Sequence, residues 1–265
     1  MNQQDIIAAA KAAFADDEAV RGLFLSGSFG RGTADEWSDV DLLAVVSKDD
    51  QRGAADRWRT ALNGLAPVVY WNELERGGFL INAVTKDWLR CDLYIQEPGK
   101  IGVRAKNTIA PLIDRDGIYD GLPDALPPKT PNPHALRYQI NEFIRILGLT
   151  PVAMGRGEYL TAVMGNGLLR GLLTDLFMQD VTEPDSGGIL HLSKLLPAAQ
   201  IKIMSDLPFP NATADSVMEA HLAIARVFMP RARTMAERLN VEWPEAFEAA
   251  TRRVLQEKLG VAADW

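Results

Sequence analysis

Two aspartates, Asp39 and Asp41, lie one residue apart at the start of an apolar segment that ends at Val46. Residues i and i+2 of a β-strand point to the same side, so the two carboxylates are predicted to lie side by side, about 7 Å apart at their Cα atoms. Carboxylates this close repel each other unless a cation lies between them. Oxygen ligands of this kind suit Mg²⁺, which takes one or two protein carboxylates and completes its shell with substrate phosphates and water.

The pair Gly27–Ser28 is the second feature that could take part in catalysis or ligand binding. Ten residues separate it from Asp39. Glycine lets backbone N–H groups approach a phosphate closely, and a serine hydroxyl can donate to phosphate oxygens. The loop lacks both the Gly-Lys-Ser/Thr ending of a P-loop and the Rossmann Gly-x-Gly-x-x-Gly pattern, which excludes these two sites. Loop and aspartates together predict a nucleotide-handling metal site. The alternative is a hairpin-like turn with surface aspartates.

Apolar periodicity predicts the elements that position these residues. Strands are predicted at 20–26, 40–46, 67–71, 78–84 and 88–95, and helices at 3–15 and 50–65. The strand at 40–46 is apolar on both sides, which predicts burial of both its faces. The strand at 88–95 carries a lone carboxylate, Asp92.

A proline-rich stretch divides the chain. It contains Pro123, Pro127, Pro128, Pro131 and Pro133, a composition typical of a stiff linker. We therefore predict an N-terminal domain at 1–126, a linker at 127–133 and a C-terminal domain at 134–265. The predicted fold class is α+β, with a mixed β-sheet and flanking helices in the first domain and an α-helical bundle in the second.

Apolar stripes at helical spacing support the bundle. One stripe consists of Leu136, Ile140, Phe143, Ile144 and Leu147, and another of Leu160, Met164, Leu168, Leu172 and Leu176. Gly167 and Gly171 lie four residues apart in the second stripe. Their spacing predicts close contact with a neighbouring helix.

Composition limits the class of protein. The 265 residues carry a formal net charge of −7, which argues against an electrostatic grip on nucleic acid. A single cysteine fits a reducing compartment. The N-terminus shows no secretory signal, and no apolar run approaches the roughly 20 residues of a membrane span. We expect a cytoplasmic protein that binds neither nucleic acid nor membrane. Nothing in the sequence specifies an oligomeric state.

Gly27–Ser28, the ten-residue gap and Asp39-Val40-Asp41, with their flanking strands, resemble the DNA polymerase β-like nucleotidyltransferase superfamily over roughly residues 1–97. The resemblance implies a nucleoside triphosphate held by the Gly27–Ser28 loop and two Mg²⁺ ions held by three carboxylates. Asp92 is the candidate for the third. Glu73 is an alternative, in which case Asp92 would be an edge-strand residue paired with Arg90.

The acidic domain followed by a helical bundle further resembles the antibiotic nucleotidyltransferases that modify aminoglycosides or lincosamides. Residues 155–159, Gly-Arg-Gly-Glu-Tyr, are similar to a segment of the two-domain lincosamide enzymes. This resemblance implies transfer of AMP from ATP, or of another nucleoside monophosphate, to a hydroxyl of a small molecule, with release of pyrophosphate and a role in antibiotic resistance. It also implies that Glu158 is the general base, with Asp92 as the alternative.

Two basic residues, Arg31 and Lys194, are candidates for contact with the triphosphate. Two other functions stay open from the sequence. One is a nucleotidyltransferase that modifies a protein partner, as antitoxin-like members do. The other is a catalytically inactive nucleotide-binding module.

Overall fold

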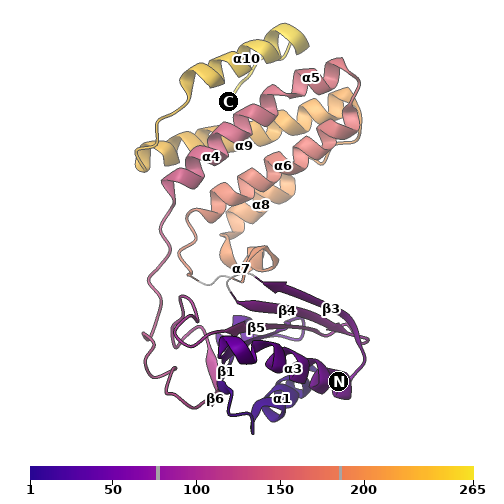
Figure 1. Cartoon of the computed structure of the whole chain (residues 1–265). Helices are drawn as coiled ribbons and strands as arrows, with labels where there is room; N and C mark the ends of the chain where they lie inside the picture. Colours follow the sequence, from indigo (N-terminus) through magenta and orange to yellow (C-terminus); the bar gives the residue numbers. More distant parts are fainter. Residues whose placement is uncertain (76–77, 185–186) are drawn as a thin grey trace. The chain divides into compact units, whose positions relative to one another are not determined.

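The computed structural model describes residues 1–75, 78–184 and 187–265. The chain forms two compact units, Met1–Pro127 and Pro128–Trp265 (Figure 1). The division falls inside the proline-rich stretch. Each unit has its own hydrophobic core.

A six-stranded mixed sheet in the order β3-β4-β5-β2-β1-β6 forms the first unit. Its strands are β1 (Val20–Leu25), β2 (Val40–Val46), β3 (Val68–Glu75), β4 (Phe79–Thr85), β5 (Arg90–Gln96) and β6 (Ala110–Asp114). The pair β2–β5 is parallel and all the other neighbouring pairs are antiparallel. The predicted mixed sheet is confirmed.

Helices α1 (Gln3–Phe14) and α3 (Gln51–Leu65) pack against one face of this sheet (Figure 1). Asn2 caps α1, accepting hydrogen bonds from the backbone N–H groups of Gln4 and Asp5. Trp58 of α3 is fully buried against alternate strand residues such as Leu42 and Leu93. On the other face, residues of the segment 101–122 cover β1 and β2, so both faces of β2 are buried, as predicted.

The regular secondary structure among the described residues of the second unit is entirely helical. Its helices are α4 (Pro133–Gly148), α5 (Thr150–Gly155), α6 (Tyr159–Met178), α7 (Leu192–Leu195), α8 (Ala198–Asp206), α9 (Ala214–Arg238) and α10 (Glu245–Leu259). The predicted stripe of α4 is buried, and Phe143 stacks on Phe228 of α9 with ring centroids 3.8 Å apart. The predicted helical C-terminal region is confirmed.

The stripe predicted for α6 is wrong in its first half. Leu160, Met164 and Leu168 are 70%, 71% and 58% exposed, whereas Leu172 and Leu176 are buried. The first half of α6 packs through smaller residues instead, including Ala162, Gly165 and Asn166. Small side chains let this helix approach its neighbours closely, which hydropathy alone does not reveal.

The prediction of close helix contact at Gly167 and Gly171 is also wrong. A Cβ atom built on either glycine meets no atom within 4 Å in the described structure. By contrast, a Cβ on Gly165 would lie 3.8 Å from both His221 and Ile146. This contact of α6 with its neighbours therefore lies on the opposite side of the helix from Gly167.

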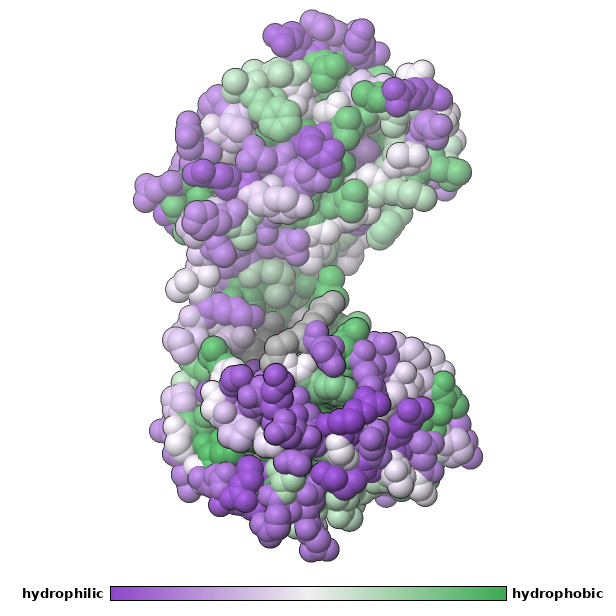
Figure 2. Space-filling view, viewed as in Figure 1, coloured by the Kyte–Doolittle hydropathy of each residue, from purple (hydrophilic) through white to green (hydrophobic). Residues whose placement is uncertain are grey.

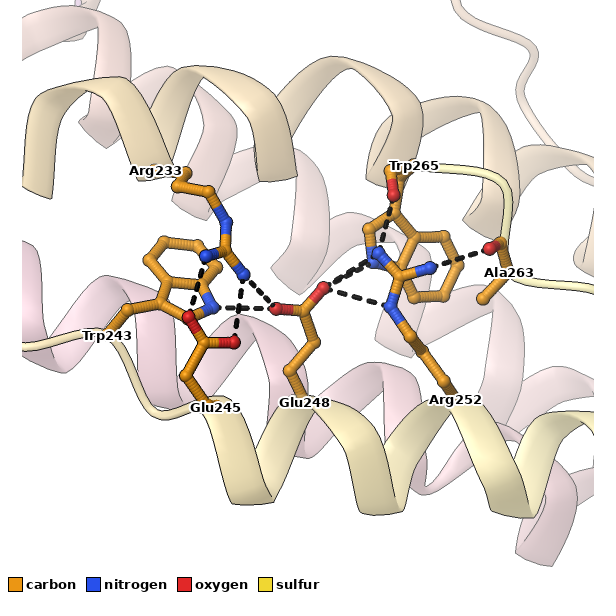
Figure 3. Close-up of polar contacts among 7 residues, drawn as sticks. All are labelled: Arg233, Trp243, Glu245, Glu248, Arg252, Ala263 and Trp265. Carbon is orange, nitrogen blue, oxygen red and sulfur yellow. Dashed lines mark hydrogen bonds and ion pairs between the residues drawn. The ribbon is translucent and has the colours of Figure 1, made fainter.

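A buried carboxylate, Glu248 of α10, fixes the end of the chain against the bundle (Figure 3). It accepts hydrogen bonds from Trp243 Nε1 (2.6 Å), Arg233 Nη2 (2.7 Å), Arg252 Nη2 (2.8 Å) and Trp265 Nε1 (3.2 Å). Arg252 also donates to the carbonyl oxygens of Ala263 and Trp265. Both oxygens of the carboxylate are thus satisfied although the residue is only 5% exposed.

His221 of α9 joins three helices in the core of the second unit. Its Nδ1 lies 3.0 Å from Thr150 Oγ1 and its Nε2 lies 3.1 Å from the carbonyl oxygen of Ala162. The carbonyl can only accept, so Nε2 carries the proton and Nδ1 of the neutral ring accepts from the threonine hydroxyl. Burial lowers the pKa of His221, against a smaller opposing effect of the bond to Ala162.

We expect the second unit to lose stability as the pH falls below the ordinary histidine pKa of 6.5. The folded-state pKa of His221 is lowered, so below 6.5 the unfolded chain takes up the proton first. The contribution of His221 to the free energy of unfolding is therefore constant above pH 6.5. Below pH 6.5 it falls by at most about 1.4 kcal/mol per pH unit. Urea unfolding between about pH 8 and 5.5 measures this slope. A variant lacking His134 and His191 should keep the slope, and His221→Asn should lose it.

Among the described helices, none is long and apolar enough to cross a membrane. Figure 2 shows one face of the chain, on which hydrophilic residues are interspersed with apolar ones over both units.

Candidate active site

The parallel pairing of β2 and β5 brings two of the predicted carboxylates together. Asp41 and Asp92 are directly opposite each other in the register, on strands that lie side by side. Neighbouring strands are about 4.8 Å apart, so these carboxylates are adjacent. Asp39 precedes β2 by one residue and shares the side of Asp41. β5 lies inside the sheet between β4 and β2, so the alternative of Asp92 as an edge-strand residue is wrong.

Gly27 brings the loop into contact with this pair. It opens the short helix α2 (Gly27–Gly30) with a φ of +57°, in the left-handed region. A Cβ atom on Gly27 would lie 1.9 Å from Asp41 Oδ2, so only glycine leaves room for the carboxylate. In addition, Ser26 N donates to the backbone oxygen of Asp41 at 2.8 Å. The loop is therefore fixed directly against the aspartate strand.

The next residue, Ser28, is buried, with 6% of its surface exposed. Its hydroxyl is buried and has no hydrogen-bond partner within the described part of the chain. Gly30 ends the same turn, and a Cβ there would lie 2.5 Å from the backbone oxygen of Thr108. The loop is thus enclosed on both sides, and it holds a polar group that a phosphate oxygen would satisfy.

We expect Gly27→Ala to reduce nucleotidyl transfer by about a hundredfold, because the new methyl group displaces the Asp41 carboxylate. Gly32→Ala is the matched control. Gly32 also has a positive φ, +69°, but a Cβ there meets no atom within 4 Å in the described structure. Both variants carry similar backbone strain, and only Gly27→Ala has the clash. Equal activity of the two in a pyrophosphate-release assay would contradict the role of this contact.

The electrostatics of the site favour a bound cation. Burial raises the pKa of Asp92, and the charge of Asp39 adds to this effect. A hydrogen bond from the Asn82 side chain and the charge of Arg90 oppose it. The arginine reaches Asp39, with Nη2 3.5 Å from Oδ2. Arg90 thus offsets part of the negative charge of Asp39 and Asp92.

The donor set fits Mg²⁺, since all the candidate ligands are carboxylate oxygens. Within residues 1–75, 78–184 and 187–265, no three His, Cys, Asp or Glu side chains are gathered closely enough to hold an ion by themselves. Asp39 forms an ion pair with Arg90. Because Mg²⁺ needs only one or two protein carboxylates beside substrate phosphates, the pair Asp41 and Asp92 meets the minimum.

The alternative metal ligand, Glu73, does not join this cluster. It lies on β3, which β4 separates from β5. Its carboxylate accepts hydrogen bonds from Trp71 Nε1 at 2.7 Å and from Arg52 Nη1 of α3 at 2.5 Å. These bonds, that of Trp71 first, lower the pKa of Glu73.

The other predicted site residues lie in different surroundings. Arg31 is half-buried and follows α2 directly, so it stays within the loop region. Glu158 and Lys194 belong to the second unit. Glu158 is the exposed residue that precedes α6, and Lys194 is exposed on α7.

Sequence reasoning missed Asn82 as part of the site. Asn82 of β4 is paired with Asp92 on one side and with Asn72 of β3 on the other, which forms a polar row across the sheet. The sequence did contain a signal for this residue, because Asn82 is a polar residue within a largely apolar predicted strand. Arg90 was considered only as a partner of Asp92, whereas its ion pair is with Asp39.

Comparison with known proteins finds a family match over the part of the chain that contains these residues. Residues 7–108 match the family model described as the nucleotidyltransferase domain, which spans the loop and all three aspartates. No curated protein matches the chain.

Among solved structures, an aminoglycoside 6-adenyltransferase from Bacillus subtilis is 14% identical, with 95% of each chain covered and a TM-score of 0.43. A nucleotidyltransferase-like protein from Exiguobacterium sibiricum is 13% identical, with 96% of this chain and 88% of that one covered and a TM-score of 0.39. The Cid1 poly(U) polymerase is 22% identical over 35% of this chain and 29% of its own, with a TM-score of 0.27.

The family match and the geometry of Gly27, Asp41 and Asp92 agree. The chain contains a nucleotidyltransferase domain at residues 7–108, and the prediction of a nucleotidyltransferase is confirmed at that level.

Proposed function

We propose that the protein transfers a nucleoside monophosphate, AMP from ATP, to a hydroxyl of a small molecule such as an aminoglycoside or a lincosamide. The observation that carries the proposal is the contact of Gly27 with the Asp41 carboxylate, beside Asp92 in the paired strand. It supports the proposal because the Gly27–Ser28 loop, the candidate for phosphate binding, lies against a pair of carboxylates. Nucleotidyl transfer needs both groups at one point.

In the proposed reaction the acceptor oxygen forms a new bond to the α-phosphorus. The bond from this phosphorus to the oxygen that bridges to the β-phosphate breaks, and pyrophosphate leaves. The hydroxyl proton passes to a carboxylate. Asp92 is one candidate for the proton acceptor in the first unit, and Glu158 is the candidate from the second unit.

The residues of the first unit have separate roles in this scheme. Gly27 and Ser28 bind the terminal phosphates, and Arg31 adds positive charge next to them. Asp39, Asp41 and Asp92 would hold Mg²⁺, in two ions as the resemblance implies, and Lys194 is a further candidate for the triphosphate. When bound, the metal neutralises charge that develops on the phosphate oxygens. A cytoplasmic location and a role in antibiotic resistance are part of the proposal.

A pyrophosphate-release assay tests the proposal. The full chain is supplied with ATP and Mg²⁺ and with aminoglycosides and lincosamides one at a time, and Asp39→Asn serves as the blank. Release that depends on one compound and is absent from the blank would identify both the reaction and the acceptor. Bound ATP without release for any compound would contradict a small-molecule antibiotic acceptor and favour a protein acceptor or an inactive module.

A further inference from the structure

A groove of about 350 Å³ lies within the second unit, separate from the aspartate cluster of the first. Its lining residues come from the end of α6, from α8 and from the C-terminal third of α9. These three helices are labelled in Figure 1. Its lining residues include Phe177, Gln200, Pro230, Arg231, Arg238 and the acidic Asp180. Its volume is at the lower end for small-molecule sites, so it suits a one-ring molecule.

Pro230 interrupts α9 at the groove. Proline has no backbone N–H, so the hydrogen bond to the carbonyl of Arg226, four residues earlier, is missing. One turn later, Thr234 Oγ1 donates to the carbonyl oxygen of Pro230 at 3.1 Å and is thereby occupied. Phe177 and Met235 are buried, so the floor beside the proline ring is apolar. This floor favours an apolar ligand body.

Two polar groups at the groove remain available to a ligand. Gln200 Oε1 is buried and has no hydrogen-bond partner among the described residues. Arg231 Nη1 donates to the carbonyl oxygen of Val227 at 3.0 Å, and no ion pair of this guanidinium is found in the described structure. Arg238, in contrast, is paired with Asp180. Arg231 is exposed, and its guanidinium lies 6.0 Å from the centroid of the Phe177 ring. The groove therefore offers one exposed guanidinium beside Phe177 and one buried acceptor.

We propose that this groove binds a small organic carboxylate with an apolar ring and a hydroxyl or amine donor. The carboxylate pairs with Arg231, the ring covers Phe177 and Met235, and the donor satisfies Gln200 Oε1. A guanidinium prefers a carboxylate because the two planar groups match in geometry. A bare anion would leave the apolar floor uncovered. The site lies wholly in the second unit and is independent of the proposed transfer reaction.

Isothermal titration of the full chain with 4-hydroxyphenylacetate tests the site. We expect a Kd of about 1 mM, as is typical for a fragment of this size. The neutral amide of the same compound should bind about tenfold more weakly or worse, since it loses the charge-assisted bond. Inorganic phosphate, which lacks a ring, should also bind more weakly than the carboxylate.

Arg231→Gln is expected to weaken binding of the carboxylate about tenfold and to leave binding of the amide unchanged. Arg253→Gln, which removes an exposed arginine of α10, is the matched control and should bind like the natural chain. Gln200→Leu should weaken the binding of 4-hydroxyphenylacetate and leave the binding of phenylacetate, which lacks the hydroxyl, unchanged. The proposal would be overturned if the amide or inorganic phosphate bound as tightly as the carboxylate. It would also be overturned if Arg231→Gln and Arg253→Gln bound the carboxylate with equal affinity.

Discussion

Replacement of Asp41 by asparagine is expected to reduce nucleotidyl transfer by about a thousandfold or more, with little change in the melting temperature. The variant keeps the size and shape of the side chain, so the contact with Gly27 persists. It removes one of the two adjacent negative charges that would hold Mg²⁺. Steady-state pyrophosphate release, together with thermal unfolding, measures both quantities.

Asp87→Asn provides the control for this experiment. Asp87 is exposed in the turn between β4 and β5 and is one of the acidic residues of the same unit. Removing its charge changes the net charge of the chain by the same amount without touching the cluster. If Asp41→Asn retained more than about a tenth of the natural rate, the assignment of the cluster as the catalytic site would fail.

Binding of the metal gives a second readout for the same variant. Titration of Mn²⁺ in the presence of a non-hydrolysable nucleotide should show weaker binding in Asp41→Asn than in Asp87→Asn. If Asp41→Asn bound Mn²⁺ with normal affinity but had lost activity, Asp41 would not be a metal ligand and would instead position the Gly27–Ser28 loop. The two results thus separate the carboxylate charge from the contact with Gly27.

The first unit was largely predictable because its signals are local. The run from Val40 to Val46 is apolar on both faces, and the structure covers both. The alternation of side chains along a strand fixes Asp39 and Asp41 on one side. The contact of Gly27 with Asp41 was not predicted, because the glycine was interpreted only as allowing backbone N–H groups to approach a phosphate.

Partners across the sheet were harder to predict. Strand order depends on pairings between distant segments, and the sequence alone does not specify that β5 lies beside β2. Once this order is known, Asp92 is favoured over Glu73, whose carboxylate is held by Arg52 and Trp71. Asn82 becomes relevant for the same reason, since it is opposite Asp92 in the antiparallel register.

Helix α6 shows where hydropathy fails. Large apolar residues such as Leu160 and Met164 suggested the buried face, but both are exposed. The buried face in that region contains Ala162 and Asn166, and the carbonyl oxygen of Ala162 accepts a hydrogen bond from His221 of α9. A pattern of residue type predicts which faces are apolar, whereas packing depends on volume and on the neighbouring helix.

Replacement of Glu248 by glutamine is expected to lower the free energy of unfolding of the second unit by about 3 kcal/mol. The carboxylate is 5% exposed and accepts hydrogen bonds from two arginines and two tryptophans (Figure 3). Glutamine would turn an N–H₂ group toward at least one of these donors and remove the counter-charge of Arg252, whereas Arg233 would keep its ion pair with Glu245. Urea unfolding followed by helical circular dichroism measures the loss, and Glu257→Gln, an exposed change on the same helix, should have almost no effect.

The pH dependence of this difference identifies its electrostatic origin. Burial opposes ionisation of Glu248, but the hydrogen bonds from Trp243 and Arg252 outweigh it, so the pKa of this carboxyl is lowered in the folded state. Stability from such a group is present above the ordinary glutamate pKa of 4.5 and is lost as the pH falls through the lowered value. The gap between the natural chain and Glu248→Gln should therefore narrow below 4.5. If the difference in the free energy of unfolding stayed constant at acidic pH, the destabilisation would come from packing around Trp243 and Trp265 and not from the charge of Glu248.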